Sequence, residues 1–363
     1  MTHRKVLIVN IANLGYGGIS SVIMNYVRKT YQDVDYGVVL CSAVEEKLVD
    51  ELRSYGVKIF LPPYSRRRKP FAYSIWLKKL LKEYKYDIIH VHGSSSTMYS
   101  EIHAAKQAHV PIRVAHSHSS SCKYVTIHKV LKPFLNSELT HAIACSDSAG
   151  KWLFTKAYSI LPNGIDVDKF AFSQTIRDEY RKKMGLEDKF VIGHIGYMDT
   201  EKNHMFLLRV FKKLVEVRPD ARLLLIGDGR LRSEIEQYIE ENQLSDVVQV
   251  LGNRTDVANL YQCMDIFVLP SLFEGLPVTL VEAQSAGLRC LVSSAVTTQA
   301  NITGDVQYLS VDDENMGEWI RMLSENGDVT RNRSIFAETM GNSAFNISKS
   351  VEALLQAYQI DKK

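Results

Sequence analysis

Two glutamates, Glu274 and Glu282, lie on either side of a turn that leads into a helical pattern. Gly275 and Pro277 shape the turn, and the first turn of a helix leaves backbone N–H groups without acceptors, which favours a bound phosphate. Glu282 lies about one turn further along, where its carboxylate could reach a vicinal diol such as that of ribose. This pattern would suit a nucleotide sugar. The alternative is that Glu274 caps the helix and Glu282 is an ordinary surface residue.

These residues require a scaffold, and the chain predicts one made of parallel strands. Short, almost wholly apolar runs alternate with amphipathic stretches, which is typical of parallel sheets buried on both faces, with ligands beyond the carboxyl ends of the strands. Two series of strands predict two doubly wound α/β domains, with an irregular linker within 161–188. The expected strands are 5–10, 36–41, 58–61, 87–92, 112–116 and 141–145, then 190–196, 221–227, 247–251, 265–269 and 288–293.

Length and composition agree with a globular chain of two domains. The 363 residues are 45% hydrophobic and 23% charged, and no apolar run approaches the ~18 to 20 residues of a membrane span. The start is interpreted as a first strand rather than a signal peptide. The cysteines are odd in number and far apart, which argues against a disulfide framework or structural zinc and favours a reducing cytoplasm. They are Cys41, Cys122, Cys145, Cys263 and Cys290.

Charge is divided unevenly along the chain. Residues 1–170 carry 23 Lys and Arg against 13 Asp and Glu, whereas the rest carry 21 against 28. A basic first half suggests that it meets an anionic partner, and nucleic acid, an anionic membrane and a phosphorylated substrate all fit.

Much of this excess lies in residues 66–85, where basic and aromatic residues alternate before and along a helix that Pro70 is expected to begin. The segment is either a surface helix that packs its apolar face on the sheet or a site that docks on an anionic bilayer. No nucleic-acid motif accompanies the charge, so nucleic acid is not expected as a partner. The membrane-surface candidates are Arg66, Arg67, Arg68, Lys69 and Trp76.

Taken together, several motifs resemble those of the family 4 retaining glycosyltransferases with the GT-B fold. They are the Glu274-x7-Glu282 pair within SLFEGLPVTLVEAQSAG, the segments GYMDTEKN, ACSDS and LPNGID, and the glycine-rich first loop, in this order over most of the chain. The chain is most similar to bacterial members that build capsular or exopolysaccharide repeat units. The resemblance implies two Rossmann-like domains that face each other across a cleft. These would be an acceptor-side domain of residues 1–170 with a C-terminal helix at about 343–363 packed back on it, and a nucleotide-sugar domain of residues 171–342.

The resemblance also implies roles for individual residues. Glu274 would contact the donor sugar, His118 would face that sugar near the scissile bond, and Lys202 would neutralise the diphosphate as a point charge. Glu282 would hydrogen-bond the ribose hydroxyls. The other implied donor-binding positions are Gly17, Gly18, Tyr197, Arg254, Gly275, Leu276, Thr279 and Leu280.

One position departs from the family pattern. Tyr197 follows Gly196 where the family usually has an arginine that clamps the diphosphate. Losing this charged donor could cost several kcal/mol if nothing replaces it. Arg230, in the loop after the neighbouring strand, is a candidate substitute, although a loop arginine is more often solvated.

The remaining histidines and acids are assigned smaller roles. His92 is the better acceptor-side candidate of a strand-end pair with His90, and His116 is expected to point away from His118. No histidine trio has convincing zinc spacing. The Asp-Val-Asp run at 166–168 is similar to the metal-binding motif of another glycosyltransferase fold, but it is interpreted as a turn, so no metal or other cofactor is expected.

The resulting expectation is an enzyme that transfers a hexosyl unit from a nucleotide sugar, most simply UDP-linked, to a saccharide acceptor that is lipid-linked. It would be cytoplasmic and peripheral on the inner face of the plasma membrane. Three alternatives stay open: a nucleotide-sugar epimerase of the same fold, a catalytically weak binding subunit, and a dinucleotide oxidoreductase. Product analysis, turnover and a preference for NAD over UDP would distinguish them.

Overall fold

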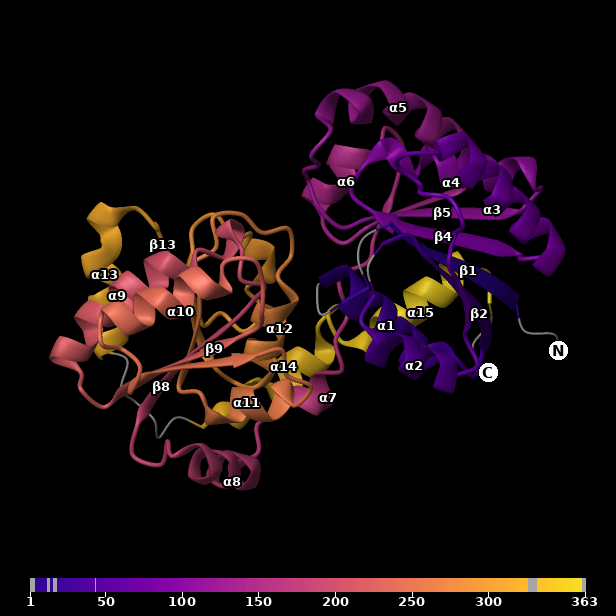
Figure 1. Ribbon diagram of the computed structural model, residues 1–363. Coiled ribbons are helices and arrows are strands. Elements are labelled where there is room, and N and C mark those ends of the chain that lie inside the picture. The colour runs from indigo at the N-terminus through magenta and orange to yellow at the C-terminus, as the bar shows by residue number, and fades with distance from the viewer. Residues whose placement is uncertain (1–3, 12–13, 16–17, 43, 326–331, 361–363) are drawn as a thin grey trace. The chain divides into compact units, whose positions relative to one another are not determined.

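The computed structural model describes the chain except for residues 1–3, 12–13, 16–17, 43, 326–331 and 361–363 (Figure 1). The chain forms two compact units. Unit 1 consists of residues 1–165 and 344–363, and unit 2 consists of residues 166–343. The boundary therefore lies between Ile165 and Asp166, before the position expected after residue 170.

Unit 1 is built on a parallel sheet in the order β3-β2-β1-β4-β5-β6-β7. Helices α3, α4 and α5 cover one face, and α1, α2 and α15 cover the other (Figure 1). The strands are β1 (Arg4–Asn10), β2 (Val34–Leu40), β3 (Lys58–Phe60), β4 (Ile88–Gly93), β5 (Ile112–Ser117), β6 (His141–Ala144) and β7 (Ser159–Ile160). The helices are α1 (Gly18–Thr30), α2 (Glu46–Ser54), α3 (Pro70–Tyr84), α4 (Tyr99–Gln107), α5 (Val125–Glu138), α6 (Asp147–Leu153) and α15 (Ile347–Ala357), with a short 3-10 turn η1 (Ser96–Met98).

Helix α15 comes from the C-terminal end of the chain but belongs to the core of unit 1. Its Val351 and Leu354, and Tyr358 just beyond it, are buried with Val22 and Tyr26 of α1. Burial of this apolar face removes it from water, which is the main favourable term in the packing of a helix. The C-terminal segment therefore supports the first sheet rather than the second.

Unit 2 repeats the architecture with a parallel sheet in the order β10-β9-β8-β11-β12-β13. The strands are β8 (Phe190–Ile195), β9 (Ala221–Ile226), β10 (Val248–Gly252), β11 (Ile266–Leu269), β12 (Arg289–Ser293) and β13 (Val306–Leu309). The helices are α7 (Val167–Phe170), α8 (Gln174–Met184), α9 (His204–Val217), α10 (Arg232–Glu241), α11 (Val257–Cys263), α12 (Val278–Ser285), α13 (Met316–Glu325) and α14 (Ala337–Asn342). The 3-10 turns are η2 (Thr200–Lys202), η3 (Thr298–Ala300), η4 (Asp313–Asn315) and η5 (Arg333–Phe336).

The sequence missed one edge strand in each sheet. β7 has two residues, both exposed, and β13 is only partly buried. Neither therefore has the buried apolar pattern from which the inner strands are predicted. The expected linker also contains two helices, α7 and α8, and the Asp-Val-Asp run at 166–168 begins α7 rather than forming a simple turn.

Within the described residues, we find no helix that is both long and apolar enough to cross a bilayer.

Candidate functional site

The loops after β8 and β11 bring a lysine and a glutamate together at the carboxyl edge of the unit 2 sheet. Lys202 Nζ pairs with Glu274 Oε1, and the Ser271 hydroxyl donates to the same oxygen at 2.9 Å. The two charged side chains are 20% and 13% exposed. The Leu272 amide donates to the Glu201 carbonyl at 2.8 Å, which ties the two loops to each other. The arrangement places one cation and one anion at an accessible strand end.

Two glycines allow the loop around Lys202 to pack this closely. A Cβ on Gly196 would lie 3.0 Å from Lys202 Cδ, so the lysine stem lies directly against the backbone. Gly227, at the end of β9, has a φ of +131°, and a Cβ there would lie 2.1 Å from the Gly196 carbonyl oxygen. A residue with a side chain at 227 would be both strained and in collision with the backbone.

Helix α12 begins directly after this turn, at Val278. Its N-cap residue is Pro277, which makes no side-chain cap, so Glu274 is not a capping acid. The Leu280 amide donates to the Pro277 carbonyl at 3.1 Å, whereas the N–H groups before it have no acceptor within the helix. The Thr279 hydroxyl, also in this turn, is buried without a described partner. The start of α12 therefore offers donors beside the Lys202–Glu274 pair.

Glu282 lies further along α12 and is not an ordinary surface residue. It is partly buried, and its Oε2 accepts a hydrogen bond from the Tyr261 hydroxyl at 3.0 Å. Loss of solvation raises the pKa of its carboxyl to about 7, while the Tyr261 hydrogen bond and the charge of Lys169 oppose that rise. The group can therefore change its charge near neutral pH.

Tyr197 and Arg230 lie on neighbouring loops. Tyr197 is 59% exposed. Arg230 donates from Nε to Asp199 at 2.9 Å and from Nη2 to the Thr200 hydroxyl at 3.3 Å, and its side chain is 65% exposed. The guanidinium is thus held against the loop that carries Tyr197, with much of it open to solvent. Arg254, in contrast, is engaged by Asp256 in two hydrogen bonds of 2.8 and 2.6 Å.

In unit 1, four histidines gather on the face of the sheet that α1 and α15 cover. His92 of β4 stands opposite His116 of β5, and residues two apart on a strand share a face. The His116 and His118 rings accordingly stack at 4.2 Å, so the expectation that His116 points away from His118 was wrong. His92 Nδ1 lies 2.9 Å from His118 Nε2, and His90 Nδ1 lies 2.6 Å from the Tyr358 hydroxyl.

Burial governs the charge of these imidazoles. All four are at most 8% exposed. Burial holds the pKa of His90, His92 and His116 well below the usual value and lowers that of His118 to about 4. Ring nitrogens of His90, His92 and His116 lie within 4.8 Å of one another. These three rings are 9° to 36° from parallel.

Of the two first-loop glycines that are expected to bind the donor, the structure describes only Gly18. Gly17 lies outside the described residues. Gly18 begins α1, and a Cβ there would meet nothing within 4 Å.

The basic segment before α3 is less uniform than the sequence suggests. Arg66 is not a surface residue, because its Nη2 donates to the Glu101 carboxylate at 3.1 Å and to the Thr97 carbonyl at 2.7 Å, and its side chain is only 12% exposed. Trp76 is half-buried. Of the residues between them, Tyr73 is buried, whereas Arg67, Arg68, Lys69 and Phe71 are open to solvent, and Phe71 is 86% exposed.

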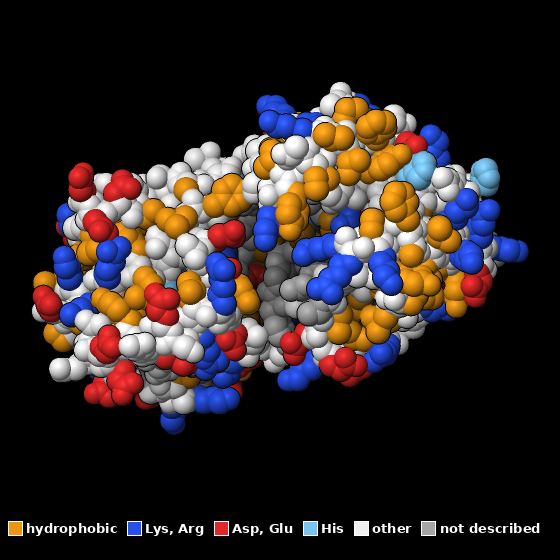
Figure 2. Space-filling model, turned by 45° about the horizontal axis from the view of Figure 1, so that its top comes forward, with side chains coloured by type: hydrophobic (Ala, Val, Ile, Leu, Met, Phe, Trp, Pro, Cys, Tyr) orange, Lys and Arg blue, Asp and Glu red, His pale blue; other side chains and the backbone are white. Residues whose placement is uncertain are grey.

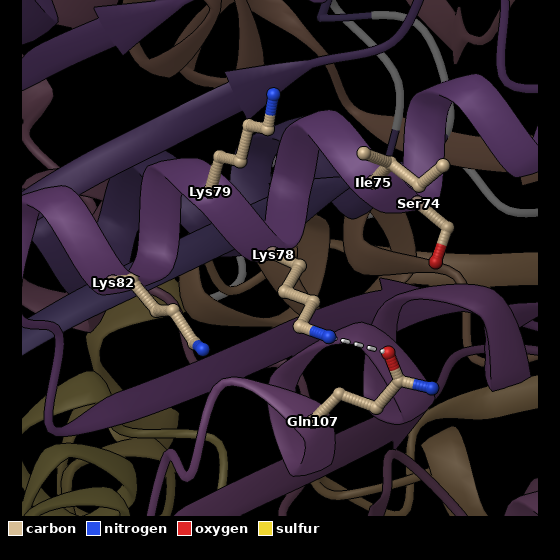
Figure 3. A pocket seen from close by; sticks show the side chains of 6 residues that line it. All are labelled: Ser74, Ile75, Lys78, Lys79, Lys82 and Gln107. Atoms are coloured by element: carbon tan, nitrogen blue, oxygen red, sulfur yellow. Dashed lines mark hydrogen bonds between the residues drawn. The ribbon is translucent and has the colours of Figure 1, made fainter.

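Further along α3, a pocket lies between α3 and Gln107 of α4. Lys78, Lys79 and Lys82 line it, and Lys78 donates to Gln107 at 3.0 Å (Figure 3). Figure 2 shows exposed hydrophobic side chains and basic ones next to each other over unit 1.

Sequence reasoning missed two residues at the unit 2 site, Ser271 and Tyr261. Ser271 lies in the same motif as Glu274, so its position was visible although its bond was not. Tyr261 belongs to a different helix, α11, and no local pattern links it to Glu282.

Comparisons with known proteins agree with this architecture. Residues 16–169 match the family described as Glycosyltransferase Family 4, and residues 176–333 match Glycosyl transferases group 1. EpsF of Bacillus subtilis, which is named as a glycosyltransferase, is 32% identical over 377 residues, covering 99% of this chain and 97% of EpsF. The UDP-Gal:alpha-D-GlcNAc-diphosphoundecaprenol alpha-1,3-galactosyltransferase of Escherichia coli is 30% identical over 383 residues, covering 98% and 97%.

A solved structure gives the same result for the fold. HepE of Anabaena, in complex with UDP-glucose, matches with a TM-score of 0.83 at 17% identity, over 98% of this chain and 100% of HepE. The fold and the family matches place the protein among the GT-B glycosyltransferases. The chain belongs to glycosyltransferase family 4, whose members are retaining hexosyltransferases, and the fold and enzyme class predicted from the sequence are confirmed.

Proposed function

We propose that the enzyme transfers a hexosyl unit from a UDP-sugar to a lipid-linked saccharide, with retention, in the synthesis of an exopolysaccharide or capsule. The Escherichia coli relative is named for a UDP-sugar donor and a diphosphoundecaprenol acceptor, and HepE binds UDP-glucose. The observation that carries the proposal is the Lys202–Glu274 pair beside the uncapped first turn of α12.

The donor would be held mainly by unit 2. Lys202 and the amides near Thr279 and Leu280 would take the diphosphate, because a cation and a helix start both favour an anion. Glu282 would accept from the ribose hydroxyls, and Glu274 would contact the sugar together with the backbone of Gly275 and Leu276. Tyr197 and the region of Arg254 would lie next to the nucleotide. We expect no metal ion to be needed for this.

The reaction would then depend on stabilising the leaving group. Negative charge grows on the diphosphate as the glycosidic bond breaks, and donors that are already in place stabilise that charge without reorganisation. The acceptor hydroxyl would attack the sugar carbon on the same face that the diphosphate leaves, and its proton would pass to the departing diphosphate, so that the products are the new glycoside and UDP. Arg230 is the substitute that we propose for the usual diphosphate-clamping arginine, because its exposed guanidinium lies beside the Tyr197 loop.

His118 would face the donor sugar from unit 1, with His92 on the acceptor side. The 2.9 Å contact between their ring nitrogens would hold the His118 ring in one orientation. Because burial keeps His118 neutral at physiological pH, its contribution would be a hydrogen bond rather than a charge.

Donor binding gives the first test of this function. A panel of nucleotide sugars, scored by release of free UDP or GDP with lipid-linked saccharide acceptors, should identify a UDP-sugar. Glu282→Gln should raise the donor KM about 10- to 100-fold, because a hydrogen bond to a charged group is worth about 1.5–3 kcal/mol. The substitution should change kcat less, because the contact with the ribose is equally strong in the ground state and in the transition state.

The matched control is Glu240→Gln, an exposed glutamate on α10 of the same unit, which should leave both constants unchanged. Nucleotide binding without turnover would instead indicate a binding subunit. A free sugar or an epimer as the product would indicate a hydrolytic or epimerase activity, and an unchanged KM in Glu282→Gln would reject the assigned ribose contact.

We further propose that unit 1 docks on an anionic bilayer through α3 and α5, which flank α4 on one face of its sheet. Arg67, Arg68 and Lys69 are exposed beside Phe71. On α5 a stripe of exposed apolar residues, spaced by three or four positions, lies next to lysines. This stripe consists of Ile127, Val130 and Phe134, which are 49%, 61% and 53% exposed, and its neighbours are Lys129 and Lys132.

Vesicle binding should follow the charge of this face. Each basic residue near an anionic surface contributes about 1 kcal/mol. The enzyme should therefore sediment with phosphatidylglycerol-containing liposomes, leave them at high salt because ions screen the attraction, and bind neutral liposomes weakly. Changing Arg67, Arg68 and Lys69 to Ser should reduce binding by about 100-fold or more without changing nucleotide affinity.

The matched control removes three charges from unit 2, in the variant Lys182→Ser, Lys183→Ser and Lys213→Ser, and should sediment like the wild type. Arg66 is left unchanged in both variants because it is part of a buried ion pair. If both triple variants lose liposome binding equally, the effect is one of general charge. If neither loses liposome binding, docking at this face loses its support.

A further inference from the structure

The Tyr261 hydroxyl touches two parts of α12 at once. It lies 3.0 Å from Glu282 Oε2 and 2.9 Å from the Thr279 carbonyl oxygen. Tyr261 is fully buried. A single buried hydroxyl therefore connects the carboxylate that we assign to ribose binding with the helix turn that we assign to phosphate binding.

The Tyr261 ring is held from two sides, so the hydroxyl has one position. Phe170 packs edge-on at 5.8 Å between ring centroids, and Phe267 packs at an angle at 5.8 Å. Such aromatic contacts have preferred geometries and resist rotation of the ring. Burial also raises the pKa of the Tyr261 phenol well above its usual value, so it remains a donor at all physiological pH values.

The charge of Glu282 depends on few neighbours. Tyr261 faces it from α11 and Lys169 from α7, and both favour its ionised form. Loss of solvation favours the protonated form. With the pKa of the Glu282 carboxyl at about 7, the loss of one hydrogen-bond donor would move the group across neutrality.

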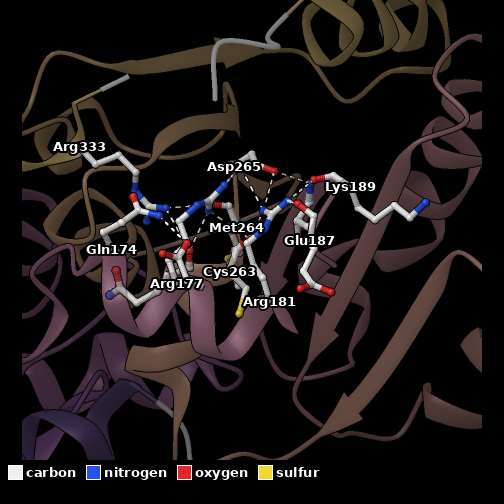
Figure 4. Close-up of polar contacts among 12 residues, drawn as sticks. Gln174, Arg177, Arg181, Glu187, Lys189, Cys263, Met264, Asp265 and Arg333 are labelled. Carbon is white, nitrogen blue, oxygen red and sulfur yellow. Dashed lines mark hydrogen bonds and ion pairs between the residues drawn. The ribbon is translucent and has the colours of Figure 1, made fainter. Parts of the chain in front are cut away.

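A buried arginine holds the two helices that carry this pair. Arg333 donates from Nε to the Ala286 carbonyl at the end of α12 at 2.8 Å. Its Nη2 donates to the Tyr261 carbonyl at 3.0 Å. Its Nη1 donates at 2.9 Å to the carbonyl of Met264, at the end of α11 (Figure 4). Gly287 permits this contact: its φ is +68°, and a Cβ there would lie 2.1 Å from the Arg333 carbonyl oxygen.

We propose that Tyr261 is a positioning residue that orients Glu282 and keeps it ionised for the donor ribose, and that Arg333 fixes the spacing of α11 and α12 on which this contact depends. The proposal rests on the assignment of Glu282 to donor binding. Neither residue need touch the substrate, since both act through Glu282.

The test measures donor KM and kcat as functions of pH. In the wild type, donor affinity should rise with pH as Glu282 becomes ionised, with its midpoint at about pH 7, and level off above that. Tyr261→Phe removes the donor and keeps the ring, so the midpoint should move to higher pH and the KM at pH 7 should rise about tenfold. The effect on kcat at saturating donor and high pH should be small.

A double-mutant cycle identifies the route of the effect. If Tyr261 acts through Glu282, Tyr261→Phe should add little to donor KM in a Glu282→Gln background. Arg333→Lys keeps the charge but loses the forked geometry, and it should raise KM as Tyr261→Phe does. The controls are Tyr308→Phe, a β13 residue whose hydroxyl donates to the Thr297 carbonyl at 3.4 Å, and Arg218→Lys, whose guanidinium bonds carbonyls of α13.

The outcomes separate the inference from the function on which it rests. If Glu282→Gln itself leaves donor KM unchanged, the ribose assignment fails. If Glu282→Gln weakens the donor while Tyr261→Phe leaves the pH midpoint in place, the inference fails and Tyr261 is only a packing residue. Should Tyr261→Phe prove unstable, the pH midpoint of Arg333→Lys decides: a midpoint like that of the wild type would overturn the proposal.

Discussion

Lys202→Ala is expected to lower kcat by about 10²- to 10³-fold, the loss typical when one donor to a developing charge is removed. The diphosphate gains charge as the sugar leaves, so the contact with Lys202 strengthens toward the transition state. The Glu282 contact does not grow in this way. Steady-state kinetics with saturating acceptor should therefore show a kcat effect for Lys202→Ala and a KM effect for Glu282→Gln.

The ion pair in the structure adds a second consequence of the substitution. Glu274 is only 13% exposed and is paired with Lys202, so Lys202→Ala leaves a partly buried carboxylate without its cation. An uncompensated anion beside the diphosphate would also weaken donor binding. Compared with Lys202→Ala alone, the double variant Lys202→Ala, Glu274→Gln should have a lower donor KM but an equally reduced kcat.

Lys202→Arg should recover part of kcat, because it retains the charge with a different geometry. Lys212→Ala, which removes an exposed lysine bonded to Asn242 on the same unit, should behave like the wild type. Small and equal changes in kcat and KM for Lys202→Ala would mean that Lys202 does not stabilise the leaving group.

The sequence predicts best those parts of the site that lie at the ends of strands. Lys202 follows the apolar strand β8, and Glu274 and Glu282 follow the apolar strand β11 within a single motif. A parallel sheet brings the turns after its strands to one edge. Tyr261 could not be found in this way. Its role depends on how α11 packs against α12, which a local pattern does not contain.

The same limit explains the misplaced residues of unit 1. A run of basic residues indicates a solvated surface, but Arg66 finds the buried carboxylate of Glu101 on α4. For the histidines, the strand period alone should have placed His116 and His118 on one face. Their meeting with His92 depends in addition on the register of β4 with β5, which the sequence does not determine.

Unit 1 is expected to unfold in mild acid before unit 2, and the buried histidines are the reason. Burial lowers the pKa of six histidines in unit 1 below the usual 6.5. In unit 2 it lowers the pKa of His194, and it lowers that of His204 to about 4. Below about pH 6.5 the unfolded chain therefore binds more protons than the folded chain. Stability is fully present above that pH and is lost as the pH falls. The six in unit 1 are His90, His92, His116, His118, His128 and His141.

The difference between the units should be large enough to measure. Each such histidine removes up to about 1.4 kcal/mol per pH unit below 6.5. The loss of stability between pH 6.5 and 5 should therefore be larger in unit 1, which has six such histidines, than in unit 2, which has two. A typical domain is stable by only about 5–15 kcal/mol. Glu282 acts in the opposite sense in unit 2. Its pKa is raised from 4.5 to about 7, so it adds stability as the pH falls through that range.

Tryptophan fluorescence can follow the two units separately, because Trp76 and Trp152 lie in unit 1 and Trp319 lies in unit 2. Urea unfolding of Trp→Phe variants between pH 5 and 8 should show that the free energy of unfolding depends more steeply on pH in unit 1 than in unit 2. His116→Leu should reduce that slope by about one proton, since both His116 ring nitrogens are buried without a partner among the described residues. Changing the exposed His109 to Asn should leave the slope unchanged. Equal slopes in the two units, or no change in His116→Leu, would show that the imidazole cluster does not set the acid limit of this enzyme.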